Sequence, residues 1–260
     1  ANFADAHHSF FISQYLAPLW SGASEWGLHF GERLFWWVHI LGIFAFLNYL
    51  PYSKHFHIIL AFPNTYYANL EAKGRFENNA TVTKEVAMMM DPTADPFAAP
   101  APDADAPVER FGAKDANDLS WANLLNAYTC TECGRCTSEC PANLTGKKLS
   151  PRKIMMDTRD RIEEIGVNIA ANGSFVDDGK SLLGDYITNE ELWACTSCNA
   201  CVQACPVDID PLNIIMKLRN FATMEESSAP GALNAMMTNV ENNGAPWPFN
   251  QMDRANWINE

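Results

Sequence analysis

The sequence predicts an all-α protein built from a membrane-crossing helix and a helical domain that carries every cysteine. Three observations lead to this prediction. A run of twenty residues, 34–53, contains no Asp, Glu, Lys or Arg. All eight cysteines follow it, in two copies of one spacing. Segments that begin with helix-capping residues surround these copies, whereas the alternating pattern of a β-strand is nearly absent.

The composition permits both a membrane segment and a packed core. Of 260 residues, 48% are hydrophobic and 19% are charged, and the formal net charge is −13. Proteins that bind nucleic acid carry basic patches, so this charge argues against a nucleic-acid partner. No basic stretch followed by a short apolar run is visible at the N-terminus, so we expect no signal peptide.

The uncharged run is long enough to cross a bilayer core of about 30 Å at about 1.5 Å per helical residue. Residues 1–85 are therefore predicted to be a membrane anchor, with the main span at about residues 32–57. A long buried helix of a soluble protein is the alternative. Aromatic residues that suit a membrane interface lie toward both ends: Trp20 and Trp26 precede the run, and Tyr49 and Tyr52 are near its C-terminal end. Lysine and arginine are absent from residues 1–31 but follow the run at Lys54, Lys73 and Arg75, which places the C-terminal side in the cytoplasm.

His39 lies inside the run, and an ionisable side chain within a membrane segment is a functional candidate. His57 follows eighteen residues later. On a continuous helix, eighteen steps of about 100° make five turns, so the two imidazoles would share one face about 27 Å apart. This arrangement suits the axial positions of two b-type haems, although Pro51 can kink the helix. Alternatively, His39 makes a hydrogen bond within a helix bundle and His57 lies at the interface.

The interval from His39 to His57, with LPYSKHFHIILAFPNTYY at its end, resembles the last membrane helix of a known family. That family is the nitrate reductase gamma subunits, which are cytochrome b anchors. The resemblance implies that His39 and His57 are axial ligands of haem b. In that family earlier helices supply the opposite ligands, and this sequence shows no convincing counterpart.

The cysteine pattern is Cys-x2-Cys-x2-Cys-x3-Cys-Pro, first from Cys130 to Pro141 and again from Cys195 to Pro206. This is the spacing of two-cluster ferredoxins, in which three close cysteines hold one 4Fe–4S cluster and the remote cysteine ligates the other cluster. The first cluster is predicted on Cys130, Cys133, Cys136 and Cys205. The second cluster is predicted on Cys195, Cys198, Cys201 and Cys140.

Two other roles for these thiols fit less well. Zinc favours separated pairs of ligands around a tetrahedron, which leaves no place for a third close cysteine. Disulfides belong to small secreted scaffolds, whereas thiolates that bind clusters favour a reducing compartment. The residue after the second cysteine is Gly134 in one copy and Asn199 in the other. Both residue types accept a left-handed backbone, which predicts matched loops.

The remaining segments are assigned from composition and capping residues. Residues 86–117 are rich in Pro, Ala and Asp and are predicted to be an extended acidic linker. Residues 118–225 form the α-helical two-cluster ferredoxin domain. Its helix starts are predicted at Ser120, Ser150-Pro151, Thr188-x-x-Glu191 and Asp210-Pro211. The helix that begins at Ser150 is expected to end near Glu164, with Gly166 as its stop signal.

The stretch CTECGRCTSECPANLTGKKLSPRKI closely resembles the ferredoxin-like C subunit of heterodisulfide reductase. It also resembles the wider family of membrane iron–sulfur oxidoreductases that join such a domain to a cytochrome b anchor. The resemblance implies an electron-transfer subunit in the cytoplasmic (inner) membrane of a prokaryote, with the cluster domain facing the cytoplasm. Its electrons would move between a soluble partner and haem b, menaquinone or another quinone in the membrane lipid.

The tail of residues 226–260 is predicted to be an interaction segment, because Trp247, Phe249 and Trp257 would otherwise form an exposed apolar patch. Its sequence NNGAPWPFNQMDRANWINE resembles the linker to a further module with paired Cys-Cys-Gly motifs in the same family. The resemblance implies a partner subunit with such a module, or a soluble donor such as an electron-transfer flavoprotein.

No Ser–His pair, paired carboxylates or phosphate-binding loop stands out, so the chain is expected to be an enzyme only as part of an oxidoreductase complex. The alternative from another class is a membrane-tethered iron–sulfur sensor or assembly protein. A zinc scaffold would be colourless and redox-silent.

Overall fold

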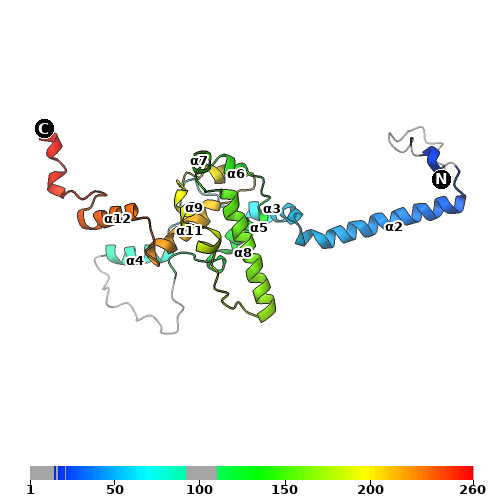
Figure 1. Cartoon of the computed structure of the whole chain (residues 1–260), viewed down its shortest axis with the longest axis horizontal. Helices are drawn as coiled ribbons and strands as arrows, with labels where there is room; N and C mark the ends of the chain where they lie inside the picture. Colours follow the sequence, from blue (N-terminus) through cyan, green and yellow to red (C-terminus); the bar gives the residue numbers. More distant parts are fainter. Residues whose placement is uncertain (1–14, 16, 21, 92–109, 260) are drawn as a thin grey trace. The chain divides into compact units, whose positions relative to one another are not determined.

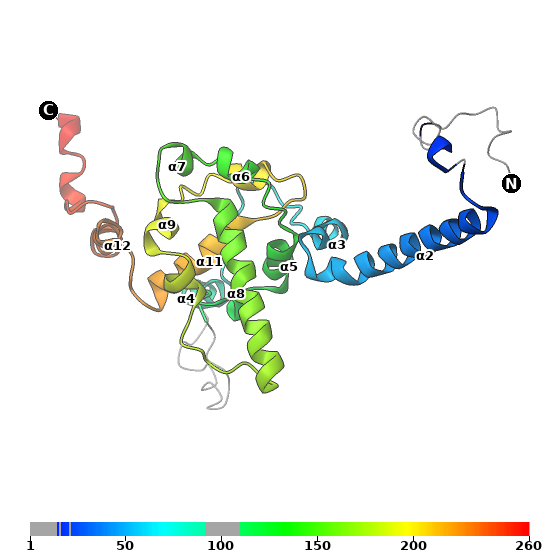
Figure 2. The same cartoon turned by 45° about the vertical axis from the view of Figure 1, so that its right-hand side comes forward.

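The computed structural model describes residues 15, 17–20, 22–91 and 110–259 (Figures 1 and 2). These residues contain no β-strand, and only an isolated bridge joins Leu183 to Ile187. The predicted all-α fold class is therefore confirmed. The chain divides into two units, Ala1–Phe56 and His57–Glu260.

The described α-helix of the first unit is α2, Glu25–Tyr49. The described α-helices of the second unit are α3 (His57–Tyr66), α4 (Ala80–Met90), α5 (Trp121–Thr129), α6 (Arg135–Ser138), α7 (Pro141–Leu144), α8 (Pro151–Asn172), α9 (Asn189–Ala194), α10 (Ala200–Gln203), α11 (Pro211–Met224) and α12 (Gly231–Asn243).

Helix α2 is apolar on all sides from Leu34 onward, whereas its first turns carry Glu25, Glu32 and Arg33. Ser24 caps its start, because the Ser24 side chain accepts a hydrogen bond of 3.2 Å from the Gly27 N–H. No residue of the helix is buried in the protein, and its exposed side chains include Trp36, Trp37 and Phe44. Within the described residues, Glu25–Tyr52 is the segment long and apolar enough to cross a membrane. The helix starts nine residues before the predicted uncharged run.

The helix does not continue to His57, so the geometric premise of the haem prediction is wrong. After Tyr49 the chain forms the short 3-10 turns Leu50–Tyr52 and Lys54–Phe56, with Ser53 extended between them at φ −115° and ψ 161°. Pro51 lacks the N–H that a continuing helix needs, and the Ser53 hydroxyl donates to the Leu50 carbonyl at 2.9 Å. The calculation that placed His39 and His57 on one face therefore no longer applies.

The core of the second unit lies around α8, which packs against α5, α6 and α11 (Figure 2). Ile154, Met155, Ile214 and Leu218 from α8 and α11 are fully buried. Burial of side chains of this size contributes roughly 1.5–3 kcal/mol each. The helices next to the cysteines are short, so this core holds the cysteine loops in place.

The helix starts that the capping residues predicted are confirmed. The Ser120 hydroxyl accepts from the Asn123 N–H at 3.4 Å, and Asp210 accepts from the Asn213 N–H at 2.9 Å. Thr188 and Glu191 form a complete capping box at the start of α9. The predicted end of α8 is wrong, because α8 runs through Gly166 to Asn172.

The glycine that ends α8 is Gly173, which has φ 80° and donates to the Ile169 carbonyl at 2.8 Å. This is the left-handed position that usually terminates a helix. Gly166 keeps a helical backbone although the residues after it are mostly exposed, and the Asn168 side chain donates to the Val176 carbonyl at 2.8 Å, which joins the last turns of α8 to the following segment. A glycine inside a helix weakens it by only about 1 kcal/mol, so Gly166 alone does not end α8.

The boundaries of the folded unit differ from those that the sequence predicted. Residues 57–90 were assigned to the anchor and linker but belong to the unit that holds the cysteines. Asn64 on α3 is buried and donates to the Val207 carbonyl at 2.7 Å. Of the predicted linker, residues 92–109 lie outside the described residues, whereas residues 110–117 are folded.

The folded end of the predicted linker packs on α11. The Ala113 N–H donates to the Lys217 carbonyl at 3.0 Å, and the Ala113 side chain is buried. Asp115 then caps the short turn Ala116–Asp118. An extended tether would leave these backbone groups to solvent, so this part of the linker prediction is wrong.

Candidate metal centre

The two cysteine runs sit in the same structural frame. In the first run, Cys130 ends α5, Cys136 lies in α6 and Cys140 precedes α7. In the second run, Cys195 ends α9 and Cys201 lies in α10. Each run is therefore a loop between the end of a helix and a short helical turn, and all eight cysteines are free thiols.

The predicted left-handed residues are confirmed in both loops: φ is 84° at Gly134 and 61° at Asn199. A second left-handed residue in each loop was missed. Glu132 has φ 58° and Ser197 has φ 56°, and each precedes the second cysteine of its run. Neither residue type marks this conformation in sequence, because non-glycine residues rarely have positive φ. Two left-handed residues turn the chain sharply, so that successive cysteines face the same space.

The thiols of the first run share a cavity with the remote cysteine of the second run. The cavity has a volume of about 80 Å³ and is lined by Cys130, Cys133 and Cys136 of the first run and by Cys205 and Cys201 of the second run. Its walls also include Met155, Val207 and Ile209; Cys130 is buried, whereas Cys133 is exposed. Thiolates are the ligands that select iron–sulfur clusters or zinc. The described residues contain no three His, Cys, Asp or Glu side chains that converge on a single-ion position.

The pKa values of the thiols are affected by the remote cysteine of the other run. Burial raises the pKa of Cys130, and the thiolates of Cys136 and Cys205 raise it further. Burial also raises the pKa of Cys195, and there the thiolates of Cys140 and Cys198 add to the effect. The structure thus brings Cys205 to the first run and Cys140 to the second, as the predicted ligand sets require.

The two thiol sets are neighbours. Burial raises the pKa of Cys201 to about 12, and the charges of Cys195, Asp210 and Cys136 act in the same direction. Cys136 belongs to the first predicted set, so its charge reaches the second set. Thiolates that are buried close together repel one another, which makes the free thiolates unfavourable. A cationic iron group that binds the thiolates removes this cost. The donor set therefore fits two 4Fe–4S clusters.

The structure does not bring the two predicted haem histidines together on one helix. His39 is exposed on α2, beside a shallow groove at Gly42. His57 is the first residue of α3 and is partly buried in the other unit. Haem ligation by His39 and His57 therefore stays a prediction.

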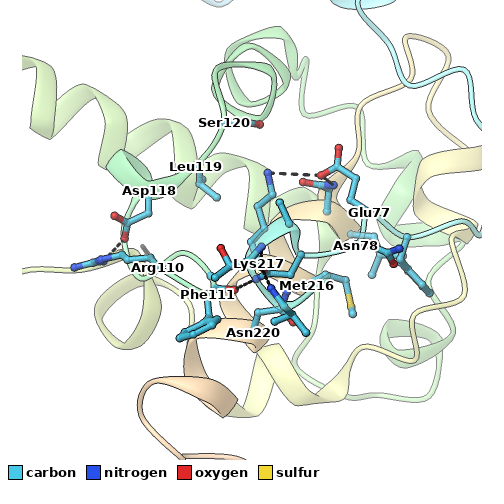
Figure 3. A pocket seen from close by; sticks show the side chains of 18 of the residues that line it. Glu77, Asn78, Arg110, Phe111, Asp118, Leu119, Ser120, Met216, Lys217 and Asn220 are labelled. Carbon is cyan, nitrogen blue, oxygen red and sulfur yellow. Dashed lines mark hydrogen bonds and ion pairs between the residues drawn. The ribbon is translucent and has the colours of Figure 1, made fainter. Parts of the chain in front are cut away.

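A larger cleft of about 670 Å³ lies beside α11 (Figure 3). Its charged side chains already have partners. Arg110 pairs with Asp118 at 2.5 Å, and the Lys217 ammonium lies 3.9 Å from the Glu77 carboxylate. The Asn79 side chain donates to the Phe111 carbonyl across the cleft. These contacts join three distant segments of the chain, and the sequence contained no signal for them.

The fold and the thiol arrangement define a helical iron–sulfur protein with two clusters. Residues 129–209 match the family described as the 4Fe-4S dicluster domain. The relatives are iron–sulfur oxidoreductases and heterodisulfide reductase subunits, so the predicted resemblance is confirmed.

Three relatives illustrate this similarity. A probable iron-sulfur-binding oxidoreductase of Bacillus subtilis, FadF, is 31% identical over 96% of this chain and 36% of its own length. An EtfAB:quinone oxidoreductase of Syntrophomonas wolfei is 29% identical over 88% of this chain and 31% of its own length. The third is the C subunit of a ferredoxin/F420H2-dependent heterodisulfide reductase of Methanosarcina acetivorans, which is 34% identical over 42% of this chain and 54% of its own length. The chain thus spans about a third of the length of the first two relatives.

Proposed function

We propose that this chain is the electron-transfer subunit of a membrane-bound oxidoreductase. Electrons pass through two 4Fe–4S clusters between a soluble redox partner or catalytic subunit and haem b or quinone in the membrane. The observation that carries the proposal is the exchange of remote cysteines, because Cys205 lines the cavity of the first run and the Cys140 charge acts on Cys195. Two sites interlocked in this way belong to one electron path.

In this proposal the two ligand sets are those that share cysteines across the runs. The first set is Cys130, Cys133, Cys136 and Cys205. The second set is Cys195, Cys198, Cys201 and Cys140. When bound, each 4Fe–4S cluster takes up and returns one electron. The chain's residues supply burial, thiolate ligands and hydrogen bonds such as the one from the Ser197 N–H to the Cys195 Sγ, at 3.4 Å.

The membrane end of the path is assigned to α2. Its length, its apolar surface and the Lys and Arg residues that follow it support a span with the cluster domain on the cytoplasmic side. The similarity to an EtfAB:quinone oxidoreductase supports an electron-transfer flavoprotein as donor and a quinone, such as menaquinone, as acceptor. The similarity to heterodisulfide reductase supports instead a partner subunit with Cys-Cys-Gly motifs. Haem b on His39 and His57 belongs to the same proposal.

A membrane-tethered iron–sulfur sensor or assembly protein is the second candidate. The observation in its favour is that Cys133 and Cys198, one from each run, are exposed, and exposed ligands make a bound group easier to lose. Electron transfer remains the better supported function, because a sensor does not need two interlocked ligand sets.

Paired cysteine variants test the ligand sets directly. If the remote cysteines are exchanged, C133S/C205S removes two ligands of one cluster and should leave about four iron atoms per chain. C133S/C140S then removes a ligand from each cluster and should leave little iron. If each run holds its own cluster, the two results are reversed. Iron and sulfide analysis of anaerobically purified protein separates the two patterns.

Turnover and spectra test the rest of the proposal. Reduction of a quinone by the membrane-inserted protein with its donor should stop in C140S if the path is correct. A reduced-minus-oxidised optical spectrum should show the sharp bands of cytochrome b over a broad iron–sulfur bleach. Loss of those bands in H39A and H57A would assign the ligands, whereas their absence from the wild type would reject haem. Survival of quinone reduction in C140S would favour the sensor.

A further inference from the structure

The two cysteine loops differ in charge at one equivalent position. Glu132 and Ser197 each lie just before the second cysteine of their run and have nearly the same φ, 58° and 56°. The first loop therefore carries a carboxylate at a place where the second loop carries a hydroxyl.

The carboxylate of the first loop is neutralised by an arginine. Arg159 on α8 lies 2.8 Å from the Glu132 carboxylate, with about a fifth of each side chain exposed, 20% and 19%. Asp160 lies 3.6 Å from the same guanidinium. The ion pair contributes no net positive charge beside the first thiol set.

The arginine of the second loop makes a different set of contacts. Arg219 on α11 donates from Nη2 to the carbonyls of Leu192 at 2.8 Å and Cys195 at 2.6 Å, and from Nε to Leu192 at 3.2 Å. Its Nη1 donates to the Ser197 hydroxyl at 3.2 Å. The guanidinium also lies over the Trp193 ring, 4.9 Å from the centroid. The Arg219 guanidinium therefore joins the end of α9 to the loop between Cys195 and Cys198.

No carboxylate of the described residues pairs with Arg219. Within the described ranges, every hydrogen bond and ring contact recorded for this side chain is to a neutral group. Burial lowers the pKa of Arg219, and the charge of Cys195 acts in the opposite direction. An arginine remains protonated even so, because its usual pKa is above about 12. A partly buried positive charge consequently sits beside the second loop.

We propose that Arg219 is a positioning residue that holds the 195–198 loop and raises the reduction potential of the cluster on Cys195, Cys198, Cys201 and Cys140. Reduction adds one electron and makes that site more negative by one charge. A fixed positive charge in a partly desolvated position favours the more negative form. Arg135 and Arg152 line the first cavity but are exposed to solvent, which screens their charges.

The inference rests on the ligand sets of the proposed function, and a redox titration tests it apart from electron-transfer activity. The midpoint potential of each cluster is measured by electron paramagnetic resonance in anaerobic full-length protein. The signal of the second cluster is assigned in C133S, where only that cluster is expected to remain complete. R219Q should lower the equilibrium constant for reduction of the second cluster at least tenfold, which is about 59 mV for a one-electron couple. R219K keeps the charge and should restore most of the shift.

The loop difference supplies a matched pair of variants that leaves both arginines in place. S197E gives the second loop the carboxylate of the first and should lower the potential of the second cluster. E132S removes the nearer carboxylate of Arg159, leaves Asp160 at 3.6 Å, and should raise the potential of the first cluster. Glu132 already adopts this left-handed conformation, so a Glu at position 197 should be tolerated by the backbone. S197E therefore still tests the inference if the R219Q protein does not bind iron.

Three results would overturn the inference: an unchanged potential in R219Q with full iron content, an equal shift in R219K and R219Q, or no shift in S197E. Full iron content with the expected shifts in potential would support the inference. Failure of the ligand sets would appear separately, as the reversed pattern of iron content in C133S/C205S and C133S/C140S.

Discussion

Asp115 holds the buried Arg161 by a two-point hydrogen bond, with Nε to Oδ1 at 2.9 Å and Nη2 to Oδ2 at 2.7 Å. The Arg161 side chain has no exposed area, and it also contacts Asp178 at 2.6 Å and the Lys180 carbonyl at 2.9 Å. Asp115 in turn accepts from the Leu182 N–H at 3.0 Å. One arginine of α8 therefore joins the end of the linker to the segment that leads to the second cysteine run.

R161M should lower the free energy of unfolding by about 3–5 kcal/mol, because it leaves two carboxylates without their cation in a partly buried site. Urea unfolding of the anaerobic protein measures the change. K148M is the control, since Lys148 and its partner Glu190 are 70% and 61% exposed and solvent screens their pair. Similar losses in R161M and K148M would contradict the structural role of Arg161.

The same cluster predicts an acid dependence of stability. The Arg161 guanidinium lowers the pKa of Asp178 to about 2, whereas an Asp in the unfolded chain has a pKa of about 3.9. The stabilisation from this carboxylate is fully present above the unfolded value and is lost as the pH falls through about 2.

The comparison of wild type with D178N isolates this effect. The wild type should exceed D178N in the free energy of unfolding by about 1–3 kcal/mol at pH 7, and the difference should shrink below pH 4. Urea midpoints at pH 7, 4 and 3, at equal iron content, follow the change. A difference that stays constant down to pH 3 would show that the Asp178 pKa is not lowered.

The left-handed loop residues predict that substitution will destabilise the first loop but leave the second loop almost unchanged. G134A should cost about 1–2 kcal/mol through its backbone alone, because an added Cβ would have space, with Arg152 Nη1 the nearest atom at 3.9 Å. N199G should have little effect, since glycine adopts the same conformation freely. Thermal unfolding at matched iron content gives both values. Equal losses in the two variants would mean that the side chains, and not the backbone, determine the loops.

Gly112 marks the close approach of residues 110–118 to α11. A Cβ at this position would collide with the backbone N of Phe221 and the carbonyl O of Lys217. G112A should therefore detach this segment, with a loss of about 1–3 kcal/mol and earlier cleavage near residues 110–118 in limited proteolysis.

The matched control is G166A, because Gly166 lies inside α8 and has no atom within 4 Å of an added Cβ. Alanine there should stabilise the protein by about 0.5–1 kcal/mol, as expected for a glycine replaced within a helix. A stable G112A protein with unchanged proteolysis would show that residues 110–118 do not depend on this contact.

The local patterns of the sequence were sufficient for most elements. Ser120, Asp210 and the Thr188–Glu191 box each begin a helix because a capping side chain acts within three residues of itself. The left-handed positions at Gly134 and Asn199 followed from residue type for the same reason. Glu132 and Ser197 did not, since neither side chain favours the conformation that the loop imposes on it.

By itself, the sequence determined the helical class and the apolar segment, and it predicted the exchange of remote cysteines between the runs, because each depends on spacing along the chain. Pro51 and Gly173 are local signals for the ends of α2 and α8. Only the tertiary structure decided that residues 110–118 are folded, and that, among the described residues, Arg159 pairs with a carboxylate whereas Arg219 contacts neutral groups. These features depend on contacts between residues far apart in the chain. The energy of such contacts exceeds the conformational preference of a short segment, and it cannot be inferred from the residues of that segment alone.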